Sequence, residues 1–203
     1  MKRRAGHGLI LSALLLGACT TTPPPLTTTA LQDWQPRMAW LQGCPHWQLS
    51  GKMGLRLRQQ AGSLYIDWRD DGRHWDLQAS GPLGEGAVHL YGDPHHAILD
   101  RGAAGQQEAD SAEDLLAQQM QLHAPISSLR LWLLGRPGHT PAQVRLDATG
   151  RLRELQEQDY DIQYLQFSEQ GGAQLPSRIH IHGPQLEMLL VIHHWTLPAS
   201  CRA

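Results

Sequence analysis

The sequence predicts a mainly β protein with some α structure, in which a strongly curved antiparallel sheet has a few helices against one face. Apolar and polar residues alternate over 47–58, the pattern of a long half-buried strand. Shorter alternating segments follow, and two short stretches with helical spacing interrupt them. Because a curved sheet encloses volume that short helices need not fill, a hydrophobic hollow between sheet and helices is expected.

The other predicted strands share the two-residue period of the first. Turn signals such as Asp70-Asp71-Gly72 lie between consecutive segments, which indicates an antiparallel meander. The predicted strands are 64–68, 75–79, 88–90, 144–146, 152–155, 160–167, 178–182 and 185–195.

A short helix is predicted over 31–42, before the first strand. Pro36 is compatible with this helix only in its first turn, because proline lacks an amide donor. Gly43 is expected to end the helix. The apolar stripe consists of Leu31, Trp34, Met38 and Leu41.

Two further short helices are predicted between the strands. Ser111, with Asp114 three residues later, resembles a capping box at the start of the first. The second is expected to run from Ser127 or Ser128 to Leu134. The apolar residues after the cap are Leu115, Leu116, Met120 and Leu122.

The first 18 residues predict a bacterial lipoprotein signal peptide. Three basic residues at 2–4 precede an uncharged run over 9–18, which is too short to span a bilayer. A cysteine directly after Gly-Ala resembles a lipobox, so Cys19 is expected to become the acylated first residue. Residues 20–30, TTTPPPLTTTA, predict a flexible, extended tether of about 30 Å at about 3.1 Å per residue. One folded domain is expected over 31–203.

Composition and charge exclude several classes of protein. With 41% hydrophobic and 18% charged residues, the chain is neither a multi-pass membrane protein, a disordered chain nor a coiled coil. Removal of 1–18 takes away three positive charges and changes the formal net charge from −2 to −5. The remaining basic residues are scattered, so we expect no binding of nucleic acid and a membrane contact that is lipidic or hydrophobic. The protein is expected to be a monomer.

Cys44 and Cys201 remain as a pair if Cys19 is acylated. Unpaired thiols are uncommon in an oxidising periplasm. Cys44 lies just before the first predicted strand and Cys201 just after the last. A disulfide would join the ends of the fold if those strands are antiparallel neighbours; two free thiols are the alternative.

The 12 histidines raise the question of a metal site. His180 and His182 share one face of a predicted strand, and the pair at 193–194 lies on the next. No carboxylate or cysteine accompanies them at ligand spacing, and they occupy the polar phase of the strands. We therefore expect them, and the pair at 95–96, to face solvent without metal or cofactor. Hydrolase and nucleotide-binding motifs are missing as well, so an enzyme is the minority interpretation.

The segment 81–86, GPLGEG, is unusual for a loop between strands. It lacks the lysine and the following helix of a phosphate-binding loop. Pro82, Leu83 and Gly84 instead place a lone leucine where few neighbours can bury it. Either Leu83 forms an exposed apolar tip that touches a membrane or an acyl chain, or it folds back onto the core.

Taken together, these segments resemble the bacterial outer-membrane lipoprotein receptor family LolB. The likeness covers nearly all of 31–195, and its most specific parts are Pro82-Leu83-Gly84 and residues 128–138. The motifs that carry it are SGKMGLRLR, YIDW, SGPLGEG, ADSAEDLL, SSLRLWLLGRPG and LLVIHHW.

The resemblance implies an incomplete antiparallel barrel capped by helices. Its hydrophobic cavity would accept acyl chains of lipoproteins from the periplasmic carrier LolA, and Leu83 would match the loop leucine that places lipoproteins into the outer membrane. Thr20, rather than aspartate, after Cys19 agrees with an outer-membrane address. Cys44 and Cys201 and the histidine-rich last strands depart from the family pattern.

The cavity lining is expected from the apolar phases of the strands and helix faces, although the same residues would equally suit a plain core. The candidates are Met53, Leu55, Ile66, Trp68, Leu77, Leu116, Met120 and Trp132. Two functions compete with that of a lipoprotein receptor. One is an envelope structural or assembly lipoprotein that binds a protein without a lipid cavity, and the other is a lipid-processing enzyme.

Overall fold

The computed structural model describes residues 28–58, 60–139, 141–170 and 172–201. The expected signal peptide, Cys19 and most of the tether lie outside them. The strands are β1 (Trp47–Leu57), β2 (Ala61–Asp70), β3 (Trp75–Ser80), β4 (Val88–Asp93), β5 (His96–Asp100), β6 (Gln106–Ala109), β7 (Ala142–Leu146), β8 (Leu152–Glu157), β9 (Tyr160–Gln170), β10 (Ala173–His182) and β11 (Leu186–Thr196). The α-helices are α1 (Thr28–Gly43), α2 (Ala112–Met120) and α3 (Ile126–Trp132), and the short 3₁₀ helices are η1 (Pro82–Gly84), η2 (Gly102–Ala104) and η3 (Ala199–Cys201).

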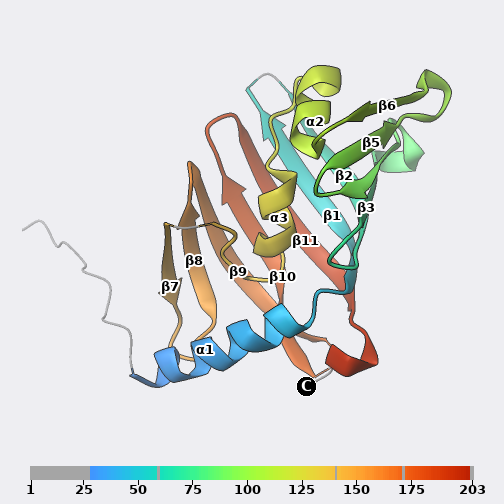
Figure 1. The fold of residues 1–203 in the computed structure, drawn as a ribbon. Helices are drawn as coiled ribbons and strands as arrows, with labels where there is room; N and C mark the ends of the chain where they lie inside the picture. Colours follow the sequence, from blue (N-terminus) through green and yellow to red (C-terminus); the bar gives the residue numbers. More distant parts are fainter. Residues whose placement is uncertain (1–27, 59, 140, 171, 202–203) are drawn as a thin grey trace, which may run out of the picture.

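The sheet consists of two meanders that meet where the first and last strands pair. The 11 strands follow the order β6-β5-β4-β3-β2-β1-β11-β10-β9-β8-β7, and neighbouring strands run antiparallel. Figure 1 shows an open, strongly curved sheet with α2 and α3 on one side and α1 across its lower end. The predicted fold class is therefore confirmed: the sheet curves as a barrel does but stays open between β6 and β7.

The pairing of β1 with β11 requires a glycine at one position. The register shifts between Ser50 and Gly51, so the strands bulge there. A Cβ atom on Gly51 would collide with the carbonyl oxygen of Val191. Gly51 thus lets the two strands that join the meanders approach closely.

Alternation along the strands separates an inner face from an outer face. Along β11, for example, Met188 and Leu190 are buried whereas Glu187 and Leu189 are only half-buried. The inner faces of both meanders and the helices together form one hydrophobic core.

Two strands, β5 and β6, were not predicted from the sequence. In β5 only three apolar residues stand between His96 and Asp100, and β6 reads QQEA, without any apolar periodicity. β6 exists because it pairs with β5, and α2 packs against both. Tertiary contacts outweigh local preference in so short an edge strand.

Helix α1 begins earlier than predicted. It starts at Thr28, so residues 28–30 are helical rather than part of an extended tether, and Pro36 lies inside the helix instead of in its first turn. An interior proline costs about 3 kcal/mol. Burial of Trp34 and Leu41 against the sheet offsets this cost.

The two other predicted helices are confirmed. The Ser111 hydroxyl oxygen accepts a hydrogen bond from the Asp114 amide at 3.0 Å, so it caps α2 as expected. α3 ends at Trp132 rather than at Leu134, because a turn closed by Gly135 follows. No helix among the described residues is long and apolar enough to cross a membrane.

Candidate functional site

An apolar pocket lies between the inner face of the sheet and the helices α2 and α3. Its volume is about 80 Å³, and only apolar residues line it. The lining comes from β1 to β5, from β11 and from the chain between α2 and the middle of α3: Met53, Leu55, Leu64, Ile66, Trp68, Leu77, Ala79, Val88, Leu90, Leu99, Leu116, Met120, Leu122, Ala124, Ile126, Leu129, Met188 and Leu190. Such a lining suits hydrocarbon and offers nothing to a charged ligand.

The structure brings seven of the eight suggested cavity residues to this pocket. They are Met53, Leu55, Ile66, Trp68, Leu77, Leu116 and Met120. Three strands, β1, β2 and β3, and helix α2 supply these seven residues, so the pocket forms only when the sheet is assembled.

Trp132 was wrongly placed in the lining. Its side chain is fully buried and packs against Tyr160, with 5.3 Å between ring centroids. Its backbone carbonyl accepts a hydrogen bond from the Tyr164 hydroxyl at 2.8 Å. Trp132 therefore belongs to the core beneath the second meander, because the last turn of α3 points away from the pocket.

Sequence reasoning missed the other lining residues for two reasons. Met188 and Leu190 belong to the apolar phase of a predicted strand, so alternation could have found them. Leu122 and Ala124 belong to the irregular segment between α2 and α3, which has no periodicity. Only the packing of this segment over the sheet places them in the pocket.

The loop with Leu83 lies at one end of the same pocket. It joins β3 to β4, and both Ala79 and Val88, which flank it, line the pocket. The Leu83 side chain is 98% exposed, so it does not fold back onto the core. Its φ of 65° is rare for a residue with a side chain, and the Gly81 amide closes the loop by donating to the Glu85 carbonyl at 2.7 Å.

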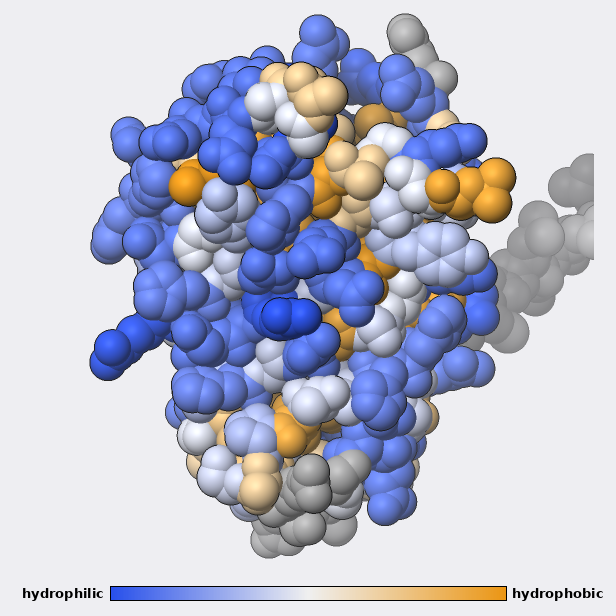
Figure 2. Space-filling view, turned by 90° about the vertical axis from the view of Figure 1, so that its right-hand side faces the viewer, coloured by the Kyte–Doolittle hydropathy of each residue, from blue (hydrophilic) through white to orange (hydrophobic). Residues whose placement is uncertain are grey.

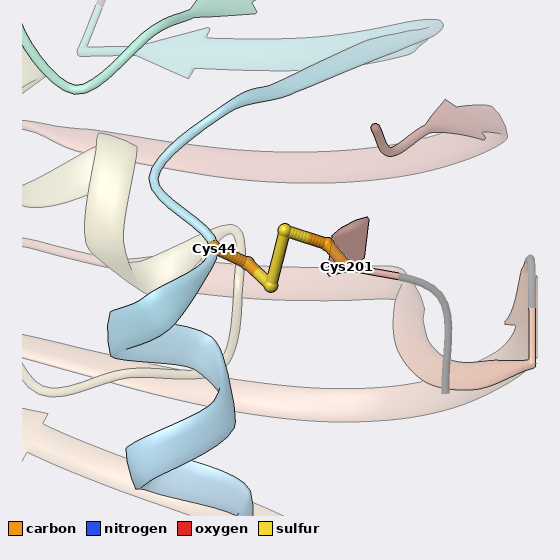
Figure 3. Close-up of a disulfide and its surroundings, with 2 residues drawn as sticks. All are labelled: Cys44 and Cys201. Atoms are coloured by element: carbon orange, nitrogen blue, oxygen red, sulfur yellow. A yellow bond between two sulfur atoms is a disulfide. The ribbon is translucent and has the colours of Figure 1, made fainter. Parts of the chain in front are cut away.

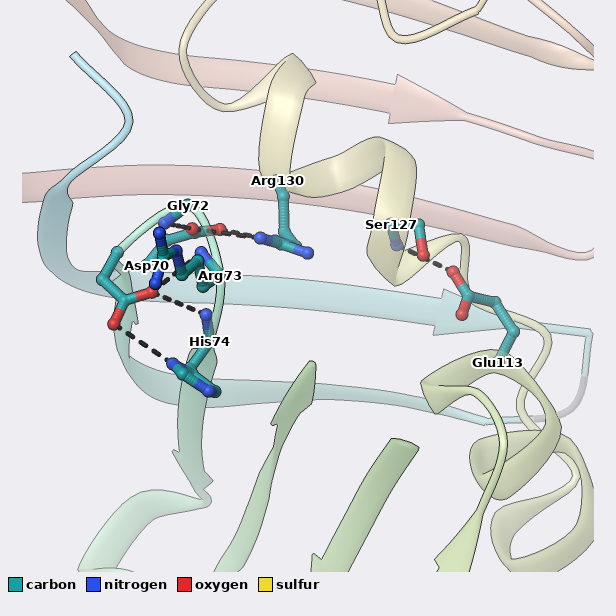
Figure 4. A network of polar contacts seen from close by, with 8 residues as sticks. Asp70, Gly72, Arg73, His74, Glu113, Ser127 and Arg130 are labelled. Atoms are coloured by element: carbon teal, nitrogen blue, oxygen red, sulfur yellow. Dashed lines mark hydrogen bonds and ion pairs between the residues drawn. The ribbon is translucent and has the colours of Figure 1, made fainter. Parts of the chain in front are cut away.

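Helix α3 is tied to the sheet at several points. Arg130 donates to both carboxylate oxygens of the buried Asp70, at 3.0 Å for the Nη2–Oδ1 pair, as Figure 4 shows. The Tyr164 hydroxyl donates to the Trp132 carbonyl. Because Asp70 ends β2 and Tyr164 lies on β9, both meanders anchor the helix.

Helix α2 is held less firmly. Among the described residues, one hydrogen bond joins α2 to another element: the Ser127 amide donates to Glu113 Oε1 at 2.7 Å (Figure 4). The remaining contacts with β4, β5 and β6 are packing contacts. At the end of the helix, Gln121 adopts a left-handed conformation with φ 53°, and the chain then crosses the pocket.

The turn next to the Asp70–Arg130 pair carries a carboxylate of unusual acidity. Backbone amides of His74 and Arg73 donate to Asp71, at 2.6 and 2.8 Å, and lower its pKa from the ordinary 3.8 to about 2. The side chain is exposed, so this effect acts on the turn rather than on the core.

Cys44 and Cys201 form a disulfide, with 5.6 Å between their Cα atoms (Figure 3). Both residues are buried. The bridge joins the segment after α1 to η3, because β1 and β11 are antiparallel neighbours and bring the two cysteines to the same end of the sheet.

A serine of α3, a histidine and a glutamate lie close together without the geometry of a catalytic triad. Ser128 Oγ and Glu157 Oε1 both approach the same nitrogen of His139, Nδ1, at 3.5 and 3.0 Å. A triad requires the acid and the serine on different ring nitrogens. Glu157 also accepts hydrogen bonds from the backbone amides of Gly138 and His139, so the group anchors the chain that follows α3.

The histidines of the last strands lie on the outer face, as expected. His180 contacts Glu187 at 2.8 Å, and this hydrogen bond lowers the pKa of Glu187. His180 and His182 help to line a hollow of about 410 Å³, whose other lining residues are mostly charged or carry amide side chains. Within the described ranges, no group of three or more His, Cys, Asp or Glu side chains is arranged to hold a metal ion.

Few large hydrophobic residues are exposed on the described surface of the protein. Figure 2 views the side of β3 to β6 and shows hydrophilic residues over most of it, with hydrophobic residues in small separate groups. The exposed large hydrophobic residues of the described chain are Tyr65, Leu83, Met120 and Leu165. Of these, Met120 lines the pocket and Leu83 lies on the loop beside it.

Comparison with known protein families identifies relatives of this chain. The family model "Outer membrane lipoprotein LolB" matches residues 45–195. The chain belongs to the LolB family. The outer-membrane lipoprotein LolB of Pseudomonas putida strain F1 is 35% identical over 165 residues, which cover 81% of this chain and 80% of the relative. The outer-membrane lipoprotein LolB of Pseudomonas syringae pv. syringae is 36% identical over 164 residues, which cover 80% of each protein.

Solved structures extend the likeness to the fold. A LolA superfamily protein from Nitrosomonas europaea has a TM-score of 0.54 at 10% identity, over 87% of this chain and 98% of that protein. A domain described as a putative outer-membrane lipoprotein-sorting protein, from Vibrio parahaemolyticus, has a TM-score of 0.54 at 11% identity, over 82% and 91%. These structures show the fold, whereas membership of the LolB family supports a role in lipoprotein localisation at the outer membrane.

Proposed function

We propose that this chain is an outer-membrane-anchored receptor that accepts lipoproteins from the periplasmic carrier LolA and inserts them into the outer membrane. The apolar pocket under α2 and α3 carries the proposal, because it suits acyl chains and little else. The exposed Leu83 at its end supports the delivery step. LolB membership supports both.

The driving force for transfer would be a series of increasing affinities. Each methylene removed from water contributes about 0.8 kcal/mol. A receptor that encloses slightly more of the acyl chains than the carrier does is favoured tenfold for each difference of about 1.4 kcal/mol. The bilayer buries the chains completely and therefore is the final acceptor.

Acyl chains require the pocket to open. A cavity of about 150 Å³ holds one benzene molecule, whereas this pocket measures about 80 Å³. We expect α2 and the segment 121–125 to move, because within the described ranges the Glu113–Ser127 bond is the one hydrogen bond between α2 and another helix or strand. α3 should stay in place, since Arg130 and Tyr164 tie it to β2 and β9.

Transfer of a radiolabelled lipoprotein from LolA to a form of the chain lacking residues 1–19 tests the proposal. We expect the label to move to the receptor and to co-purify with it. If the receptor acquires no label and contains no lipid, the pocket is a filled core. An envelope assembly lipoprotein that binds a protein partner is then the better description.

Anchoring is the second part of the proposal. Cleavage before Cys19 and acylation of its thiol and amine would hold the domain at the periplasmic face of the outer membrane, with residues from 20 onward as the tether. Metabolic palmitate should label the wild type and not a Cys19→Ala variant. Equal labelling of both forms would exclude Cys19 as the anchor.

A further inference from the structure

The pocket concentrates the thioether side chains of this protein. Besides Met1, the chain contains four methionines, Met38, Met53, Met120 and Met188. Three of them line the pocket, and they come from β1, α2 and β11. Methionine adapts its shape to ligands, which suits a pocket that must receive flexible chains.

The three pocket methionines differ in their access to water. Met188 is 1% exposed, Met53 is half-buried and Met120 is 41% exposed. Met120 is the last residue of α2, directly before the left-handed Gln121. Met120 therefore lies on the rim, because it is both exposed to solvent and part of the pocket lining.

We propose that Met120 is a site of oxidative modification and that its sulfoxide weakens the binding of acyl chains. The inference rests on the proposed function. In the reaction, the sulfur lone pair attacks one oxygen of hydrogen peroxide and the O–O bond breaks. A proton passes to the departing hydroxide, so the products are methionine sulfoxide and water. Sulfur loses two electrons and the peroxide gains them.

The sulfoxide would place a strong dipole at the entrance of an apolar pocket. Apart from the indole nitrogen of Trp68, which is buried without a partner, the lining side chains carry no nitrogen or oxygen atom. The S–O group would thus have to stay in water, and Met120 would no longer cover the acyl chain. Reduction of the sulfoxide by a methionine sulfoxide reductase would restore the thioether, which makes the change reversible.

The test uses the whole chain in outer-membrane vesicles. The vesicles are treated with hydrogen peroxide, catalase removes the excess, and a radiolabelled triacylated lipoprotein is then supplied by LolA that was never oxidised. Peptide mass spectrometry measures oxidation at each methionine. We expect Met120 to be oxidised before Met53 and Met188, and the transfer rate to fall about tenfold as Met120 sulfoxide accumulates.

Two variants separate this site from general damage. Met120→Leu keeps an apolar side chain without sulfur. Its transfer rate after the same treatment should be less than twofold below the rate of the same variant before treatment. Met38→Leu changes a residue of α1 that does not line the pocket, so peroxide should lower its transfer rate as much as that of the wild type. Oxidation of Met120 no faster than of Met188, or an equal loss in Met120→Leu and the wild type, would overturn the inference. If untreated vesicles accept no lipoprotein, the proposed function fails, whereas the order of oxidation still decides whether Met120 is the modified site.

Discussion

Replacement of Leu83 should separate acceptance of cargo from its delivery. Full burial of a leucine side chain gains about 1.5–3 kcal/mol, and nearly all of this gain is available to a side chain that is 98% exposed. At about 1.4 kcal/mol per factor of ten, insertion of Leu83 into a bilayer would strengthen membrane contact about 10- to 100-fold. Leu83→Glu should therefore slow insertion of lipoproteins by at least about tenfold.

The same substitution should leave the fold and the acceptance of lipoproteins nearly intact. Leu83 lies outside the sheet, and surface substitutions change stability by about 0.5 kcal/mol or less. Leu83→Phe keeps an apolar tip and should retain delivery. Leu83→Gly removes the tip and also relieves the left-handed strain of about 1–2 kcal/mol, so it should be at least as stable as the wild type yet deliver slowly.

The assay compares two steps in the same preparation: acquisition of a radiolabelled lipoprotein from LolA, and its subsequent incorporation into liposomes. Leu165→Glu is the matched control, because Leu165 is also exposed but lies on β9, outside the pocket lining. It should incorporate cargo at the wild-type rate. If Leu83→Glu unfolds the domain, or delivers as fast as the wild type, the reasoning about the loop is wrong.

Three further predictions concern stability. Cys201→Ser should lower the free energy of unfolding by about 2–5 kcal/mol in urea titrations, because the bridge spans 157 residues; an unchanged midpoint would contradict this. Arg130→Met should cost about 3–5 kcal/mol by leaving Asp70 buried without its partner, and the double variant with Asp70→Asn should recover part of the loss, whereas additive losses would argue against the pair. The depressed pKa of Asp71, caused first by the His74 amide, means that the carboxylate stabilises the fold above pH 3.8 and loses this effect as the pH falls to about 2; Asp71→Asn should flatten thermal stability over that range, and an unaltered pH profile would refute the assignment.

Much of this protein follows from its sequence alone, where the determining interactions are local. Alternation predicted nine of the 11 strands, because side chains on a strand point to opposite faces in turn. The spacing of Ser111 and Asp114 predicted the start of α2, since a cap involves only neighbouring residues. The Pro-Leu-Gly loop and seven of the pocket residues were also predicted, because an apolar side chain in a turn or in the apolar phase of a strand or helix is visible in the pattern itself.

Other features depend on contacts between distant parts of the chain. Whether Leu83 is exposed, whether Cys44 meets Cys201 and whether β6 forms are all decided by how the two meanders join and where α2 packs. Trp132 has the same apolar character as the pocket residues, and only the direction of the last turn of α3 places it in the core. Periodicity specifies which face of an element is apolar, but it does not specify which other element covers that face. Only the assembled sheet and helices determine whether an apolar residue lines a pocket or fills the core.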